Sequence, residues 1–230
     1  MSVAQNHLIE LLPRDARRRL LSICEPVNLV RSDVLRKSGD PTRHVYFPVD
    51  GFISLINEID EKPVLEVGMV GREGMVGVEL VLGVPITPLH TLVQGSGSSW
   101  RIGTRAFKAE LAGSPALQRA LNLYLYILMN QLASAASCLR FHLLGPRLAR
   151  WLLMTQDRAH SDTFNVTQEF LAYMLGVRRV GVTQAAQSLQ QRGMISYQRG
   201  AVQVLDRQAL KGAACTCYAA NRSAYAHLLN

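Results

Sequence analysis

The chain has 230 residues, of which 48% are hydrophobic and 18% charged, as in an ordinary folded protein with room for one medium and one small domain. The formal net charge of +8 is uneven, because residues 140–212 hold ten Arg or Lys against four acids, as a phosphate-binding surface would require. There is no apolar run of about eighteen residues and no signal-peptide core near the N-terminus, so we expect a cytoplasmic protein without a membrane partner.

The first half of the chain predicts short helices followed by a β-rich domain. Residues 6–23 are amphipathic, with leucines among arginines, which is typical of one or two short helices. Residues 26–104 then form short alternating runs separated by Gly, Pro and Asp, a pattern typical of a small antiparallel barrel or roll. We assign residues 1–114 to this domain, with strands at 27–30, 34–37, 45–48, 51–58, 64–69, 89–94 and 98–102.

Residues 115–140 predict one long helix, which begins at a proline suited to a first helical turn. Two apolar stripes follow it at three- and four-residue steps. A helix buried inside one monomer needs one stripe, so two stripes suggest that the helix contacts its own domain and a second copy together. We predict a parallel homodimer whose seam contains Leu117, Leu121, Tyr124, Leu128 and Ala135.

The most specific pattern lies at residues 165–205, within a domain that we place at 141–212, ahead of a tail at 213–230. Thr167 is suited to cap a short helix, and Gly176 stands where that helix would end in a tight turn. A second helix begins with two arginines, and residues 193–205 predict a hairpin around Arg199-Gly200. Helix, turn, helix and hairpin form a winged helix-turn-helix, a module that places one helix in the DNA major groove.

The outward edge of the second helix carries side chains that can read bases. Arginine can bond guanine, glutamine can bond adenine, and threonine or valine can contact a thymine methyl. A winged helix used only for protein contacts is the alternative. The predicted DNA-binding residues are Thr167, Gln168, Arg178, Arg179, Val180, Thr183, Gln184, Gln187 and Arg199.

The segment Thr167–Leu189, with Gly176 in its turn and Arg179 early in the second helix, resembles the helix-turn-helix of the CRP/FNR transcription regulators. The resemblance extends over nearly the whole chain. It implies an α+β fold with an N-terminal cyclic-nucleotide-binding β-roll as sensor, a long dimerisation helix and a C-terminal winged helix-turn-helix. Better-known members carry glutamate directly after that arginine, where this chain has Val180, so their operator sequence is not carried over.

The resemblance also implies a phosphate-binding cassette, for which the candidate ligand residues are Gly74, Gly77, Glu79 and His90. The glycines would form its turn, and Glu79 would bind a ribose. The family's phosphate-binding arginine has no counterpart between Glu73 and Arg101, although His90 could substitute. A missing charge-assisted hydrogen bond costs about 1.5–3 kcal/mol, so we expect a diverged or differently filled pocket with an unknown effector.

The four cysteines give weaker signals. Oxygen-sensing relatives bind an iron–sulfur cluster through several N-terminal cysteines, whereas only Cys24 lies in that region here. Cys215 and Cys217 have the wrong spacing for a zinc knuckle. Cys138 and His142 could share a metal, but a packed thiol and a hydrogen-bonded histidine are the simpler interpretation. We therefore predict no metal and no cofactor.

Together these patterns predict a sequence-specific DNA-binding transcription regulator that acts as a homodimer and contacts RNA polymerase. The chain has no nucleophile elbow, phosphate loop or paired-carboxylate motif, so we do not expect an enzyme. The alternative function is a cyclic-nucleotide-binding signalling module with a vestigial helix-turn-helix. The basic surplus of residues 140–212 and the polar edge of the second helix argue against that alternative.

Overall fold

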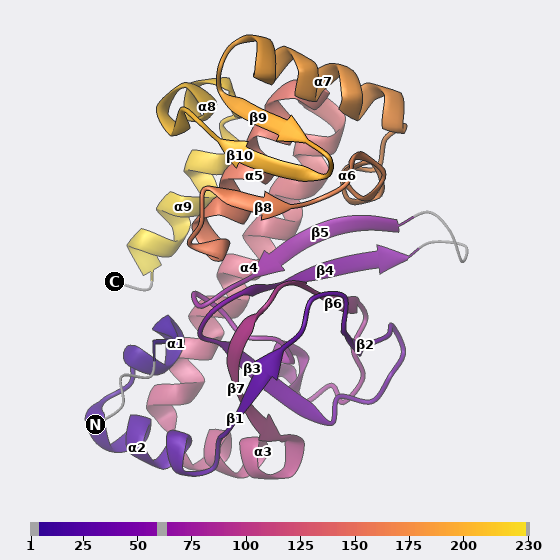
Figure 1. Cartoon of the computed structure of the whole chain (residues 1–230). Helices are drawn as coiled ribbons and strands as arrows, with labels where there is room; N and C mark the ends of the chain where they lie inside the picture. The colour runs from indigo at the N-terminus through magenta and orange to yellow at the C-terminus, as the bar shows by residue number, and fades with distance from the viewer. Residues whose placement is uncertain (1–4, 59–63, 229–230) are drawn as a thin grey trace.

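The computed structural model describes residues 5–58 and 64–228. Figure 1 shows a β-roll at one end, a helical half with its own small sheet at the other, and one long helix that runs behind both. Two short helices precede the roll, α1 (His7–Glu10) and α2 (Arg14–Ser22). The amide of Asn6 donates to the carbonyls of Pro48 (2.8 Å) and Gly74 (3.0 Å), which fixes the start of α1 against the roll.

The β-roll consists of two antiparallel sheets. One sheet has the order β1-β7-β3 and the other the order β2-β6-β4-β5, with a short 3-10 helix, η1 (Val78–Leu82), between β5 and β6. The seven predicted strands are all present, and their ends differ from prediction by at most two residues. The observed strands are β1 (Glu25–Leu29), β2 (Val34–Arg36), β3 (His44–Pro48), β4 (Phe52–Glu58), β5 (Val64–Val70), β6 (His90–Gly95) and β7 (Gly97–Gly103).

Two consecutive helices close the roll, α3 (Thr104–Gly113) and the long α4 (Pro115–Phe141). The Ser114 side chain caps α4 by accepting a hydrogen bond from the backbone N–H of Leu117 at 3.4 Å. Leu121 and Tyr124 pack with Phe47 and Phe107 in the core of the roll. The long helix is therefore part of the first domain's hydrophobic core.

The face of α4 that contacts the roll is the stripe that the sequence assigned to the dimer seam. Leu117, Leu121, Tyr124, Leu128 and Ala135 are all at most 8% exposed within the single chain. Leu117, Leu121, Tyr124 and Leu128 are buried in the apolar clusters of the roll, and α4 also packs on α9, so this stripe is covered within the single chain. The opposite face of α4 is exposed and carries Asn122, Tyr126, Met129, Ala133, Ala136 and Arg140.

The C-terminal half encloses a second core between α5 (Leu144–Ala159), α6 (Gln168–Leu175) and α7 (Arg179–Gln191). A three-stranded antiparallel sheet of order β8-β10-β9 lies beside them, formed by β8 (Thr163–Asn165), β9 (Ile195–Gln198) and β10 (Ala201–Val204). Two helices end the chain, α8 (Arg207–Ala213) and α9 (Cys217–Leu228). The tail expected after residue 213 is therefore helical, and α9 packs on α4 and α5.

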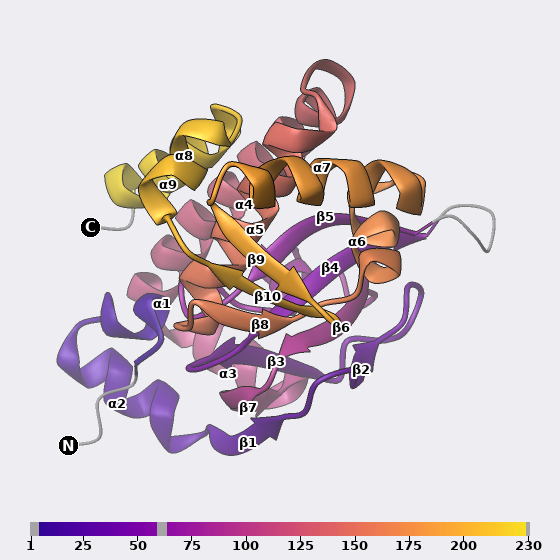
Figure 2. The same ribbon diagram turned by 45° about the horizontal axis from the view of Figure 1, so that its top comes forward.

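The two halves contact each other through the β4–β5 hairpin, which lies against α6 in both views (Figures 1 and 2). Phe52 and Met69 of the hairpin belong to the same apolar cluster as the side chains of α5 and α6. The guanidinium of Arg158 on α5 forms an ion pair with Glu73 at 2.6 Å, and both side chains are largely buried. Among the described residues, no helix combines the length and apolar character needed to cross a membrane.

Candidate nucleic-acid interface

Helix α6 begins and ends as the sequence predicts. The Thr167 hydroxyl accepts a hydrogen bond from the backbone N–H of Phe170 at 3.1 Å. Gly176 follows the last residue of α6 with φ 63° and ψ 43°, in the left-handed region that favours glycine. A Cβ at this position would lie 3.0 Å from Leu65 of β5, so the turn has little space for a side chain. Gly176 thereby sets the direction in which α7 leaves the turn.

The orientation of α7 is fixed by three buried side chains, Val182, Ala186 and Leu189. The opposite edge of the helix is exposed and presents Arg179, Val180, Gln184 and Gln187. Val180 is 61% exposed, so its aliphatic side chain is available for contact with a partner. An edge with one arginine, one aliphatic side chain and two glutamines has the groups needed to read base edges in the major groove.

Two of the predicted DNA-binding residues contact each other. The Thr183 hydroxyl donates to the side-chain oxygen of Gln168 at 2.6 Å, and it lies 3.1 Å from the carbonyl oxygen of Arg179. Thr183 and Gln168 are both only partly exposed. This hydrogen bond joins α6 to α7, so the pair holds the two helices in position rather than presenting free groups at the edge.

The hairpin between β9 and β10 supplies the wing. Its turn residues Arg199 and Gly200 have φ values of 50° and 80°, and such positive values at both positions are typical of a type I′ turn. The carbonyl of Gly200 accepts a hydrogen bond from the backbone N–H of Val166 at 2.7 Å, so the tip of the wing is held next to the start of α6. The Arg199 side chain is exposed at this tip.

Several exposed arginines of the C-terminal half lie around α7. Arg158 forms a largely buried ion pair with Glu73, and Arg207 forms a partly exposed one with Asp157. By contrast, no ion pair among the described residues involves the exposed arginines at the ends of α7 and at the wing. These are Arg178, Arg179, Arg192 and Arg199.

The glycines of the predicted phosphate-binding cassette do not line an open pocket. A Cβ on Gly74 would lie 2.4 Å from the hydroxyl of Tyr124, so the long helix fills the space beside this glycine. Gly77, with φ 100°, would similarly meet Val45 at 2.7 Å. The backbone turn is therefore packed tightly against the protein itself.

The two polar cassette residues both have protein partners. The Glu79 carboxylate accepts hydrogen bonds from the buried Arg36 guanidinium and from the Thr42 hydroxyl. His90 lies at the start of β6, with its Nδ1 3.5 Å from the carboxylate of Glu58. An arginine does reach the cassette, but it comes from β2 and neutralises the acid. No sequence signal joins Arg36 to Glu79, because they are 43 residues apart.

Comparisons with known proteins agree with this geometry. Residues 146–213, which include α6, α7 and the wing, match the family model of the Crp-like helix-turn-helix domain. FixK2 from Bradyrhizobium japonicum superposes with a TM-score of 0.71 at 14% identity, over 84% of this chain and 98% of that one. The chain has the fold of the CRP/FNR transcription regulators. The resemblance seen in its sequence is thus confirmed, and so is the α+β architecture.

Two further solved structures share the CRP/FNR fold. CLP of Xanthomonas campestris, a c-di-GMP-responsive global regulator, has a TM-score of 0.69 at 18% identity, over 84% of this chain and 99% of that one. A CRP/FNR-family transcriptional regulator from Thermus thermophilus has a TM-score of 0.69 at 22% identity, with coverage of 83% and 98%. No significant match was found among curated proteins. The exposed edge of α7 therefore lies within the region that matches the Crp-like helix-turn-helix domain.

Proposed function

We propose that the chain is a sequence-specific DNA-binding transcription regulator that acts as a homodimer. The observation that carries this proposal is the edge of α7, where base-reading side chains are exposed between arginines that have no acidic partner among the described residues. The exposed edge of α7 carries Arg179, Val180 and Gln184, three side chains of the kinds that read bases in the major groove. A vestigial helix-turn-helix would have no need of a wing tip held beside α6.

The exposed arginines divide into two roles. Arg179, on the first turn of α7, lies on the base-reading edge, whereas Arg178, Arg192 and Arg199 flank it and suit contacts with phosphates. Three phosphate contacts in each protomer would be six in a dimer. Counterion release then gives a slope of about −5 for the logarithm of affinity against the logarithm of salt concentration.

The proposed dimer interface is the exposed stripe of α4. Asn122, Tyr126, Met129, Ala133, Ala136 and Arg140 repeat at steps of four and three residues, which is the spacing of a two-stranded coiled coil. Met129 is 66% exposed and Tyr126 56%, and the small side chains at 133 and 136 would let two helices approach closely. A symmetric pair formed along this stripe would present two α7 helices to successive major grooves, about 34–36 Å apart.

The sensor domain is proposed to be diverged. Tyr124 packs beside the glycine turn and Arg36 neutralises Glu79, so an ordinary cyclic nucleotide would meet a filled turn and an acid that is already paired. We also propose that the regulator acts through RNA polymerase in the cytoplasm. These features make a cyclic-nucleotide signalling module with a vestigial helix-turn-helix the weaker candidate.

The test is a selection of bound fragments from random DNA by the full chain, in the presence and absence of cAMP and cGMP. We expect enrichment of a palindromic motif whose half-sites are about one helical turn apart, and the same motif with either nucleotide. Enrichment of no motif would refute sequence-specific binding and favour the protein-contact alternative. A motif recovered only with a cyclic nucleotide would refute the diverged sensor.

A further inference from the structure

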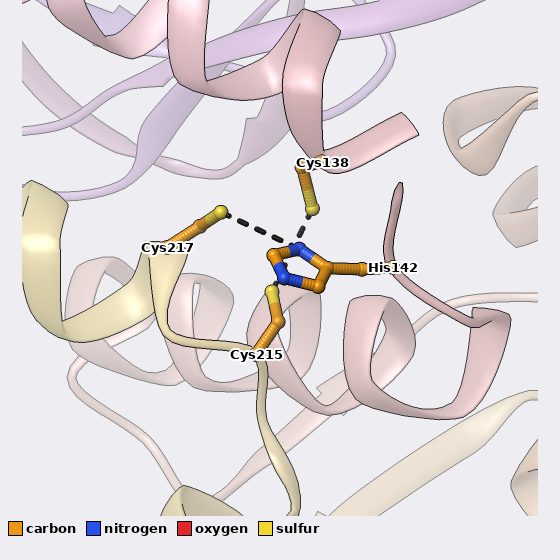
Figure 3. Close-up of side chains that lie close together, drawn as sticks. All are labelled: Cys138, His142, Cys215 and Cys217. Atoms are coloured by element: carbon orange, nitrogen blue, oxygen red, sulfur yellow. Dashed lines mark hydrogen bonds between the residues drawn. The ribbon is translucent and has the colours of Figure 1, made fainter. Parts of the chain in front are cut away.

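Four potential metal ligands from two distant stretches of the chain meet where the C-terminal end of α4 lies beside the start of α9 (Figure 3). Cys138 lies near the end of α4 and His142 directly follows that helix. Cys215 precedes α9 and Cys217 is its first residue. One ligand atom from each of the four side chains lies within 4.8 Å of all the others.

The spacing fits a single tetrahedral cation. The sulfurs of Cys138 and Cys215 are 3.6 Å apart, and the sulfur of Cys217 is 3.6 Å from Nδ1 of His142. Zinc–sulfur bonds of about 2.3 Å in a tetrahedron separate two ligand sulfurs by about 3.8 Å. Small movements of the side chains would therefore bring all four atoms to one ion. In a four-iron cluster each thiolate binds a different iron atom, so the four ligand atoms would have to lie farther apart than they do here.

The donor set selects a thiophilic divalent ion. Three cysteines and one histidine are a combination found in structural zinc sites, in which the protein supplies all four ligands. Cys138 and Cys215 are buried, while His142 and Cys217 are partly exposed, so an ion could be closed off from bulk water on most sides. All four cysteines of the chain are free thiols. Simple apolar packing explains one buried cysteine, but not three that converge on an imidazole.

Two arginines of α5 provide the charge that such a site needs. Three thiolates, a neutral imidazole and a divalent ion carry one net negative charge. Arg147 lies close to Cys138 and Cys215. Arg150 lies close to Cys215 and Cys217, so the two guanidinium groups can offset that charge. The buried Nε of Arg150 has no hydrogen-bond partner among the described residues.

We propose that Cys138, His142, Cys215 and Cys217 bind one zinc ion, which fastens α9 to the segment between α4 and α5. That segment connects the long helix to the DNA-binding domain. Arg147, next to the site, donates a hydrogen bond to the carbonyl of Leu175, the last residue of α6. The ion would therefore hold together the end of the long helix, the C-terminal helix and the helix-turn-helix. Its loss would loosen this junction while leaving the core of the β-roll intact.

The test measures metal in the full-length purified chain and does not depend on DNA binding. Elemental analysis should find about one zinc per chain in the wild type and in Cys24→Ser, the matched control, whose cysteine lies near α2. Cys215→Ser and Cys217→Ser should lose the zinc. Replacement of zinc by Co²⁺ in the wild type should give the sulfur-to-cobalt charge-transfer and visible bands of a tetrahedral thiolate site. This second measurement requires no variant that could misfold.

Three results would overturn the proposal. The first is a wild-type chain that takes up no zinc or cobalt after reduction and exposure to the free metal ion. The second is iron with inorganic sulfide, which would identify a cluster in place of a single ion. The third is equal zinc content in the wild type and in Cys215→Ser, which would place any bound ion elsewhere.

Discussion

Glu66 couples the stability of this protein to pH near neutrality. It lies on β5, and its carboxylate accepts hydrogen bonds from the Ser54 hydroxyl and from the indole Nε1 of Trp151 at 2.9 Å. Trp151 belongs to α5, so the contact joins the β-roll to the helix-turn-helix domain. Burial raises the pKa of Glu66 from 4.5 to about 7, although both hydrogen bonds act in the opposite direction.

The sign of the effect follows from this shift. Because the pKa is raised in the folded state, the folded protein holds the proton between pH 4.5 and about 7, whereas the unfolded chain releases it. The stabilisation is therefore complete below the lower value and is lost as the pH rises through the upper one. One pKa unit is worth about 1.4 kcal/mol, so the rise from 4.5 to about 7 gives a loss of at most about 3.5 kcal/mol, and less to the extent that water reaches this partly exposed side chain.

The perturbation is Glu66→Gln, which keeps the shape of the side chain and removes the titration. We would measure the free energy of unfolding by urea denaturation at several values from about pH 5 to pH 8. The wild type should lose stability relative to Glu66→Gln across this interval. Glu25→Gln is the matched control, because the Arg101 hydrogen bond lowers the pKa of the exposed Glu25 and the residue stays ionised throughout. Parallel curves for the wild type and Glu66→Gln would refute the assignment.

Three further predictions concern the proposed function. Arg179→Ala should cost about 1–3 kcal/mol of DNA-binding free energy per half-site and relax the preference at one base pair. Arg199→Ala should lower the affinity for all DNA sequences alike and make the affinity less dependent on salt concentration. Fluorescence anisotropy titrations distinguish the two, and an unchanged base preference in Arg179→Ala would contradict the role of α7. Met129→Glu should sediment as a folded monomer with reduced DNA affinity, but Leu128→Glu should unfold the β-roll, because Leu128 is buried in it; a Met129→Glu chain that remained dimeric would exclude the proposed interface. Millimolar cAMP should leave the melting temperature unchanged, whereas occupancy at one hundred times the dissociation constant would stabilise the fold by about 2.7 kcal/mol and shift the melting temperature visibly.

Local patterns predicted most of the secondary structure. The strands of the roll, the capped helix after Thr167 and the turn at Gly176 are each determined by residues close together in the sequence, so alternation, capping and glycine positions were sufficient. The long helix is different. Its two apolar stripes are similar in composition, and the buried one is decided by the open side of a β-roll formed from distant strands. Sequence periodicity could not make that choice.

The features missed by sequence analysis depend on contacts across long separations. Arg36 meets Glu79 across 43 residues, and Cys138 meets Cys215 across 77. The contact between Cys138 and Cys215 requires residues 217–228 to form α9 and pack on α4. These residues carry no strong amphipathic pattern, so no sequence pattern indicated that packing. Spacing rules for metal ligands apply within one or two short segments, so a site assembled in this way leaves no motif in the sequence.

The contact between the β4–β5 hairpin and α6 has a thermodynamic consequence for any effector. While the hairpin rests on α6, the Glu66–Trp151 hydrogen bond and the Glu73–Arg158 ion pair join the β-roll to α5, which packs on α7. If DNA binds preferentially to this docked arrangement, DNA binding must raise the affinity of any ligand that also prefers it. The ligand must then raise the affinity for DNA by the same factor. An operator would then act as an effector of the sensor, as much as the sensor acts on the operator.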